Sequence, residues 1–261
     1  MRTLVGNRHS CDTVHTARMG TAVRFVIDRP SGGLEPCRTR DARKNLQGRM
    51  VKTPWALVLA LLLLLPSATF APATALENAN AEAACALYEE IGLEGLMTET
   101  VFAKGYASIA RHGAKARVLA IADMTQPSTA KRLYLIDLDK KELVLRTWVA
   151  HGQGSGELMC SSFSNREGSH ATSKGLYRIG VEIVSPKHGA ALMLHGLDRG
   201  LNCQAQSREV IMHGADYVSA DFIAQHGRLG RSWGCPAVPR ADMPRMIDLL
   251  AGGGYLYVHG R

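Results

Sequence analysis

Residues 132–149, RLYLIDLDKKELVLRTWV, contain the clearest indication of the fold. Two runs rich in Leu, Ile, Val and aromatic residues flank the polar tetrapeptide at residues 139–142. β-prone runs on either side of a short polar turn are typical of an antiparallel hairpin. The segment therefore predicts a β-sheet in this part of the protein.

Short apolar runs of the same kind lie on both sides of this hairpin. Gly-rich connections join them, which favours a mostly-β fold, either a sandwich or an open barrel. Peripheral helices are expected at residues 221–225 and, despite Pro244, at residues 241–250. The further expected strands are residues 118–122, 175–183, 191–194, 209–212 and 255–258.

A helical pattern precedes the strands. Between residues 81 and 113, apolar residues recur three or four positions apart, as they do on one face of a helix. Gly92 and Gly95 interrupt the pattern, which predicts two short helices. Because about 35 residues bury little apolar surface alone, we expect residues 76–115 to form a helical cap on a main domain at residues 116–261.

The charge of the chain is concentrated at its N-terminus. The 261 residues are 46% apolar, which is normal for a globular protein, and carry a net charge of +8. Residues 1–52 contain 11 Lys or Arg against 4 Asp or Glu, whereas the rest of the chain contains 20 against 19. The main domain is therefore nearly neutral, and we expect no nucleic-acid partner.

Residues 50–75 are arranged like a secretory signal peptide. Lys52 lies in a short positive region, residues 55–65 are an uninterrupted apolar run, and the small residues at 73–75 suit a cleavage site. The apolar run is shorter than the roughly 20 residues of a spanning helix. This favours cleavage over membrane anchoring through an uncleaved segment, and it predicts a protein of the periplasm or cell envelope.

The preceding residues 1–49 form an Arg-rich leader without sustained periodicity, which is typical of disorder. Signal peptides do not usually follow such a leader. We therefore interpret Met50 as the true translation start, and a genuine cytosolic extension is the alternative.

Export would place the cysteines in an oxidising compartment, where disulfides form. Cys11 and Cys37 lie in the leader. If Cys235 stays free, Cys160–Cys203 is the favoured pair among Cys85, Cys160 and Cys203. The alternative is that all three are small buried apolar residues.

Cys235, in the stretch GRSWGCPAV at residues 230–238, is the strongest chemical feature. Its position between Gly234 and Pro236 places the thiol on a turn. His213 follows an apolar run and precedes Gly214, so it is a candidate base that takes the thiol proton. The alternatives are a structural cysteine and a structural histidine.

Residues near Cys235 have two interpretations each. Arg231 has two possible functional roles: it binds a substrate carboxylate, or it lowers the pKa of Cys235. The non-functional alternative is a solvated loop arginine. The same interpretations apply to Arg208. Trp233 is interpreted as a packing anchor rather than a cleft wall. His195 is a second candidate for a cleft residue or base. Surface positions are expected for His151, His170, His188, His226 and His259.

A zinc site is the competing interpretation of the histidines. His195, His213, His226 and Cys235 would supply enough ligands. The chain lacks HExxH and CxxC spacing, however, and it has no P-loop. We therefore expect neither a metal nor a cofactor.

Several segments together resemble the murein L,D-transpeptidase catalytic-domain family, which comprises YkuD-type cysteine enzymes of the bacterial cell wall. The resemblance runs from about residue 83 to the C-terminus. Its two catalytic blocks, at residues 213–218 and 230–238, are specific in combination. The other matching segments are Asp137-Leu138 with the hairpin, residues 151–156, residues 163–165 and Gly168-Ser169.

The resemblance implies a mostly-β domain with Cys235 as nucleophile and His213 as base. Ser232 and Gly234 would frame the turn, whose backbone N–H groups would hold the oxyanion, and Tyr217 would belong to the cleft. The broader L,D-transpeptidases usually have His where Trp233 stands here, whereas Cys-Pro-Ala is usual in the murein branch.

The implied substrate is a peptidoglycan tetrapeptide stem. Cys235 would attack the carbonyl between the L-centre of diaminopimelate and the terminal D-Ala, which forms a thioester. An amine of another stem would resolve the thioester as a cross-link, and water would make the protein an L,D-carboxypeptidase. A cell-wall-binding module with an inert cysteine is the alternative from another class.

Overall fold

A computed structural model describes residues 73–261, with side chains from residue 80 onward. The predicted leader, Cys11, Cys37 and all but the last three residues of the predicted signal peptide lie outside the described residues. Among the described residues, no helix is both long enough and apolar enough to cross a membrane.

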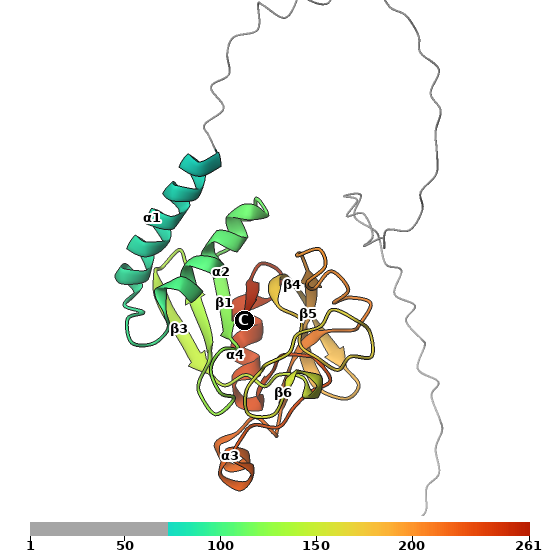
Figure 1. Cartoon of the computed structure of the whole chain (residues 1–261). Helices are drawn as coiled ribbons and strands as arrows, with labels where there is room; N and C mark the ends of the chain where they lie inside the picture. The colour runs from blue at the N-terminus through green and yellow to red at the C-terminus, as the bar shows by residue number, and fades with distance from the viewer. Residues whose placement is uncertain (1–72) are drawn as a thin grey trace, which may run out of the picture. The chain divides into compact units, whose positions relative to one another are not determined.

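One mixed eight-stranded sheet dominates the described part of the chain, with helices around it (Figure 1). The strand order is β3-β2-β1-β8-β4-β5-β6-β7, in which β1–β8 and β6–β7 are parallel and the other pairs are antiparallel. The strands are β1 (Val118–Asp123), β2 (Leu133–Asp137), β3 (Glu142–Thr147), β4 (Gly175–Ser185), β5 (Gly189–Gly196), β6 (Ile211–Ala215), β7 (Ala237–Pro239) and β8 (Tyr255–His259).

The sheet curls around one apolar core into a nearly closed, barrel-like shape. Buried residues from seven of the strands belong to this core, among them Leu135 of β2, Leu192 of β5 and Val258 of β8. The helix α4 (Met243–Leu250) adds Met243, Met246 and Leu250 to the same cluster. The predicted mostly-β fold is confirmed.

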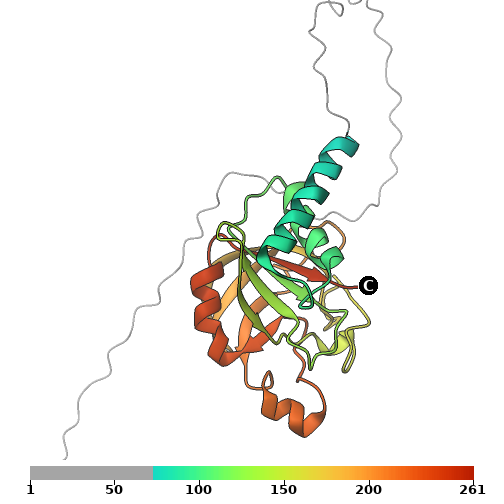
Figure 2. The same cartoon turned by 90° about the vertical axis from the view of Figure 1, so that its left-hand side faces the viewer.

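The helices α1 (Ala73–Ile91) and α2 (Glu99–Arg111) pack together and cover the other face of the sheet (Figures 1 and 2). All six residues of β1 are buried because both of its faces are covered. Ala120 and Ala122 face the barrel core, whereas Leu119 and Ile121 contact the helices.

The predicted division of the helical segment at Gly92 is confirmed. Gly92 has a φ of +71°, and the N–H of Leu93 donates to the carbonyl of Tyr88 at 3.2 Å. A left-handed residue of this kind ends a helix by satisfying its last carbonyls. The helix α3 (Ala220–His226) extends from the domain at the end opposite α1 in both views.

The sequence pattern correctly predicts the hairpin of β2 and β3, but it misses β7. That strand has three residues and ends in Pro239, so it has no measurable alternation. Proline is tolerated there because β7 is an edge strand.

The favoured disulfide is wrong. Cys160 is free and buried in the barrel core, so it is not paired with Cys203. Cys160 packs there as a small apolar residue, in agreement with the alternative interpretation of that cysteine.

Substitution of Phe102 tests whether α1 and α2 are an integral part of the domain. Its side chain is fully buried between the helices and the sheet. We expect Phe102→Ala to lower the free energy of unfolding by about 3–5 kcal/mol, because a cavity remains. Urea denaturation measures this, with the exposed Val184→Ala as a control expected within about 0.5 kcal/mol. Equal effects of the two variants would mean that the helices are only loosely attached.

Candidate active site

The parallel pairing of β6 and β7 brings the two predicted catalytic residues to neighbouring positions. His213 is in register with Ala237, two residues after Cys235. Adjacent strands lie about 4.8 Å apart. Met212 points into the barrel core, so His213, the next residue, points to the opposite face, where it is 1% exposed.

In this arrangement the Cys235 thiol does not yet bond to the base. Among the described residues its hydrogen-bond acceptor is the carbonyl of Glu209, at 3.9 Å from Sγ. Catalytic hydrogen bonds are often long or absent without substrate and form in the complex.

Ser232 closes the turn that presents the thiol. Its hydroxyl donates to the carbonyl of Cys235 at 2.5 Å and accepts from the N–H of Gly234 at 3.1 Å. Gly234 has a φ of +120°, and a Cβ there would lie 2.9 Å from the carbonyl oxygen of Ala171. The position therefore requires glycine.

The hydrogen bonds of the turn determine which backbone N–H groups are available to bind an oxyanion. The N–H of Gly234 is directed to Ser232 and is not free. The N–H groups of Trp233 and Cys235 donate to no carbonyl or side-chain oxygen in the described part of the chain. These two donors belong to the turn itself.

A second layer holds the nucleophile turn from behind. The N–H of Ser232 donates to the carbonyl of His151 at 3.1 Å, and the N–H of Gln153 donates to the carbonyl of Ser232 at 2.8 Å. Ala150 pairs with Ala237 in an isolated bridge. The start of the Gly-Ser-rich segment at residues 151–174 is thus bonded directly to the turn.

Arg132 anchors this layer from the interior. It is fully buried, and its guanidinium donates to the carbonyl of Val149 at 3.1 and 3.0 Å and to Nδ1 of His151 at 2.7 Å. Burial lowers the pKa of Arg132 to about 10. Burial, and then Arg132, lower the pKa of His151 to about 4. The expected surface position of His151 is wrong, because its ring satisfies a buried arginine.

Both candidate catalytic groups are neutral at rest. Burial raises the pKa of the Cys235 thiol, although the N–H of Ile211 and the charge of Arg208 oppose this. Burial lowers the pKa of His213 to about 4. Nδ1 of His213 lies 3.1 Å from the carbonyl of Gly214, which only accepts, so Nδ1 carries the proton and Nε2 is free as a base.

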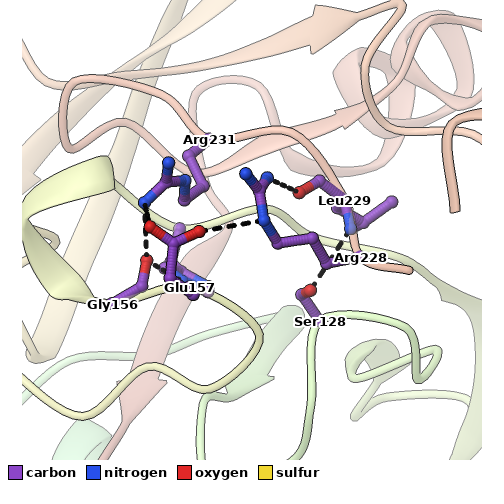
Figure 3. Close-up of polar contacts among 7 residues, drawn as sticks. Ser128, Gly156, Glu157, Arg228, Leu229 and Arg231 are labelled. Carbon is purple, nitrogen blue, oxygen red and sulfur yellow. Dashed lines mark hydrogen bonds and ion pairs between the residues drawn. The ribbon is translucent and has the colours of Figure 1, made fainter. Parts of the chain in front are cut away.

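Arg231 faces away from the thiol. It donates to Glu157 at 2.6 Å and to the carbonyl of Gly156 at 3.2 Å. Arg228 holds the same carboxylate at 3.0 Å, as Figure 3 shows. Arg231 therefore fastens the nucleophile segment to the loop at residues 156–157, and it is neither a solvated arginine nor the cation that acts on Cys235.

Arg208 is the arginine beside the nucleophile. It lowers the pKa of Cys235 and donates to the carbonyl of Ala171 and the hydroxyl of Ser173, both at 2.7 Å. Its NH2 group would lie 3.2 Å from a Cβ at position 234. The only indication in the sequence is that Arg208 precedes the strand carrying His213.

A cavity of about 360 Å³ opens next to the thiol, lined by Trp233, His170, Arg208, Glu209, Glu167, Gly168 and Ser207. Trp233 is 66% exposed, so its interpretation as a packing anchor is wrong. Its ring stacks on His170 with centroids 4.9 Å apart, and Lys187 Nζ lies 4.9 Å from it. The tryptophan is a wall of this cavity.

A second cavity of about 510 Å³ lies on the His213 side and includes His188, Gly214 and Arg240 in its lining. Tyr217 supports the start of the nucleophile segment, because its carbonyl accepts from the N–H of Gly230 at 2.9 Å. Burial, and then Cys235, raise the pKa of Tyr217 to about 12.

The remaining predicted residues lie elsewhere. His195 lies on β5 four residues from Ala191, the partner of His213, which corresponds to about 13 Å. His226 is exposed on α3. Within residues 80–261, no group of three or more His, Cys, Asp or Glu side chains is arranged to hold a metal ion.

Comparison with protein families identifies the class. The family model of the L,D-transpeptidase catalytic domain matches residues 96–259, and the chain belongs to this family. The match includes α2, all eight strands and both candidate catalytic residues. A search among curated proteins finds no match.

Two L,D-transpeptidases are among the solved structures with some similarity to this chain. The enzyme from Mycobacterium smegmatis is 14% identical with a TM-score of 0.35, and the alignment covers 56% of this chain and 60% of that one. The enzyme from Stackebrandtia nassauensis is 15% identical with a TM-score of 0.36, and the alignment covers 70% and 78%. The chain thus spans less than two thirds of the length of the first of these structures.

Substitution of Gly234 tests the turn. We expect Gly234→Ala to lower the free energy of unfolding by about 1–3 kcal/mol, because alanine is strained at this φ. Gly253→Ala is the matched control, since Gly253 has open space and an ordinary φ. Chemical denaturation compares the two, and equal stabilities would contradict the close contact with Ala171.

The pH dependence of Cys235 alkylation tests the neutral resting pair. Because burial raises the pKa of the thiol above its ordinary 9.0, we expect the rate with iodoacetamide to keep rising beyond pH 9. Mass spectrometry of the Cys235 peptide follows the reaction, and Cys235→Ala corrects for other thiols. A rate that already levels off below pH 7 would instead indicate a preformed thiolate–imidazolium pair.

Proposed function

We propose that this protein is a peptidoglycan L,D-transpeptidase that acts on diaminopimelate-containing tetrapeptide stems. The observation that carries the proposal is the position of Cys235 in the turn just before β7, the strand that pairs with the His213 strand, where the N–H of His213 donates to the carbonyl of Pro236 at 3.4 Å. The bond from Nδ1 to the carbonyl of Gly214 leaves Nε2 of His213 available as the base. Membership of the L,D-transpeptidase catalytic domain family supports the same reaction class.

The first half-reaction forms the thioester. Nε2 of His213 takes the Sγ proton as sulfur attacks the carbonyl between the L-centre of diaminopimelate and D-Ala. The N–H groups of Trp233 and Cys235 hold the oxyanion of the tetrahedral intermediate. The intermediate then collapses, the C–N bond breaks, and the imidazolium returns its proton to the leaving amine of D-Ala.

The second half-reaction releases the enzyme. An amine of a second stem attacks the thioester carbonyl, His213 removes its proton, and the C–S bond breaks to give a new amide. The thiolate recovers its proton from the imidazolium. Sulfur and imidazole supply both the nucleophile and the base, so the scheme needs no metal or cofactor.

The cavity of about 360 Å³ beside Cys235 suits the donor stem. Diaminopimelate carries both an amine and a carboxylate on its side chain. The cavity lining carries charges of both signs, from Glu167 and Glu209 and from Arg208. The exposed Trp233 adds an apolar face. The expected contacts are thus with the peptide part of the wall.

The proposed location is the periplasm or cell envelope. Its support is the signal-peptide pattern at residues 50–75, together with a substrate that lies outside the cytoplasmic membrane. Cleavage would leave a mature chain that begins near the first residues of α1.

The test is incubation of the purified protein with a muropeptide tetrapeptide, followed by mass spectrometry. We expect a cross-linked dimer with loss of D-Ala, no product from Cys235→Ala, and a decrease of at least about 100-fold for His213→Gln. Cys85→Ala is the matched control, since Cys85 is a free cysteine on the α1 helix.

Two outcomes would change the assignment. A tripeptide without dimer would indicate the carboxypeptidase reaction, with water as the acceptor. Unchanged product from Cys235→Ala, or no product from any form of the protein, would contradict the proposal for this donor.

A further inference from the structure

The turn between β4 and β5 reaches both sides of the nucleophile. His188 stacks on His213, with ring centroids 3.7 Å apart and ring planes 23° apart. The preceding residue, Lys187, lies over the ring of Trp233 at 4.9 Å. Two adjacent residues of one turn therefore contact the candidate base and the tryptophan two positions before Cys235.

The backbone of this turn places the imidazole of His188. Its N–H lies 3.3 Å from the hydroxyl of Ser185, and Gly189 has a φ of +73° where the chain enters β5. The imidazole of His188 makes no hydrogen bond within the described chain. Its contact is the ring of His213, along one wall of the second cavity.

The ring of His213 makes one hydrogen bond within the described part of the chain. Its hydrogen bond joins Nδ1 to the carbonyl of the next residue, Gly214, at 3.1 Å. A bond to a neighbouring residue selects the tautomer, but it restrains the tilt of the ring only weakly because hydrogen bonds tolerate broad angles. A ring stacked at 3.7 Å excludes water from that face and blocks its tilting.

We propose that His188 is a positioning residue for the base: its stacked ring holds the His213 imidazole buried and oriented, with Nε2 toward the nucleophile turn. The proposal rests on the function assigned to His213 above. His188 itself exchanges no proton with substrate in this scheme.

The groups that face His213 determine the direction of the expected pH effect. They are His188 and Lys187 of the turn, Arg240 of the short helix η2 (Arg240–Asp242), and the carbonyl of Gly214. Burial is the largest cause of the low pKa of His213, about 4, and the three basic residues add to it. Removing the His188 ring admits water, which stabilises the imidazolium, so the pKa of His213 rises toward its ordinary 6.5.

The experiment compares His188→Ala with His188→Phe, which keeps a flat ring on His213 without its charge. NMR titration of the His213 imidazole reports the pKa independently of any substrate. Kinetics with the muropeptide tetrapeptide report kcat and KM across pH. His226→Ala is the matched control, because His226 is an exposed histidine on α3, and melting curves show that each variant is folded.

For His188→Ala we expect an upward shift of the His213 pKa by about one unit or more. We also expect kcat to fall by about tenfold or more with little change in KM, and its acidic limb to move to higher pH. His188→Phe should keep the pKa low and kcat within about twofold of the parent. The control variant should match the parent in every measurement.

An unchanged His213 pKa in His188→Ala would overturn the proposal. So would equal losses in His188→Ala and His188→Phe, because the imidazole would then act by its own chemistry. If no variant and not even the parent turns over muropeptide, the proposed function fails, while the titration still decides whether His188 controls His213.

Discussion

The arrangement of this protein depends on the parallel pairing of β6 with β7. That pairing joins the end of the His213 strand to the residues that follow Cys235, so it places the two candidate catalytic residues on neighbouring segments. β7 is only three residues long, so it cannot hold this position alone. The bridge from Ala150 to Ala237 and the bonds of His151 and Gln153 to Ser232 fasten its far side, and the buried Arg132 holds that layer in turn.

Burial has opposite effects on the two reacting groups. It raises the pKa of the Cys235 thiol and lowers the pKa of His213, because a low-dielectric site disfavours both the thiolate and the imidazolium. The resting site therefore stores no ion pair, and charge develops only when the proton moves. N–H donors that are already in place, such as those of the turn at Cys235, then contribute most to stabilising the charge that develops.

The sequence singled out the candidate catalytic pair, but it did not indicate the contacts around that pair. Cys235 and His213 stand out because a Gly-Cys-Pro turn and a histidine at a strand end have recognisable local patterns. Arg231 and Arg208 are equivalent in sequence terms, and only their partners distinguish them: Glu157 holds one, while the other lies beside the thiol. His151 is buried rather than exposed because its ring pairs with the buried Arg132, whereas Trp233 is 66% exposed rather than packed beneath the turn.

By itself the sequence determined the β-prone runs of the main strands, the break between the first two helices, and the turn that holds Cys235. These are local properties, set by side-chain pattern and backbone preference over a few residues. The tertiary structure alone decided the strand order, the edge strand β7, the stack of His188 on His213 and the layer behind Ser232. Those contacts join residues far apart in the chain, and their energies come from burial and complementary shape, which no local pattern encodes.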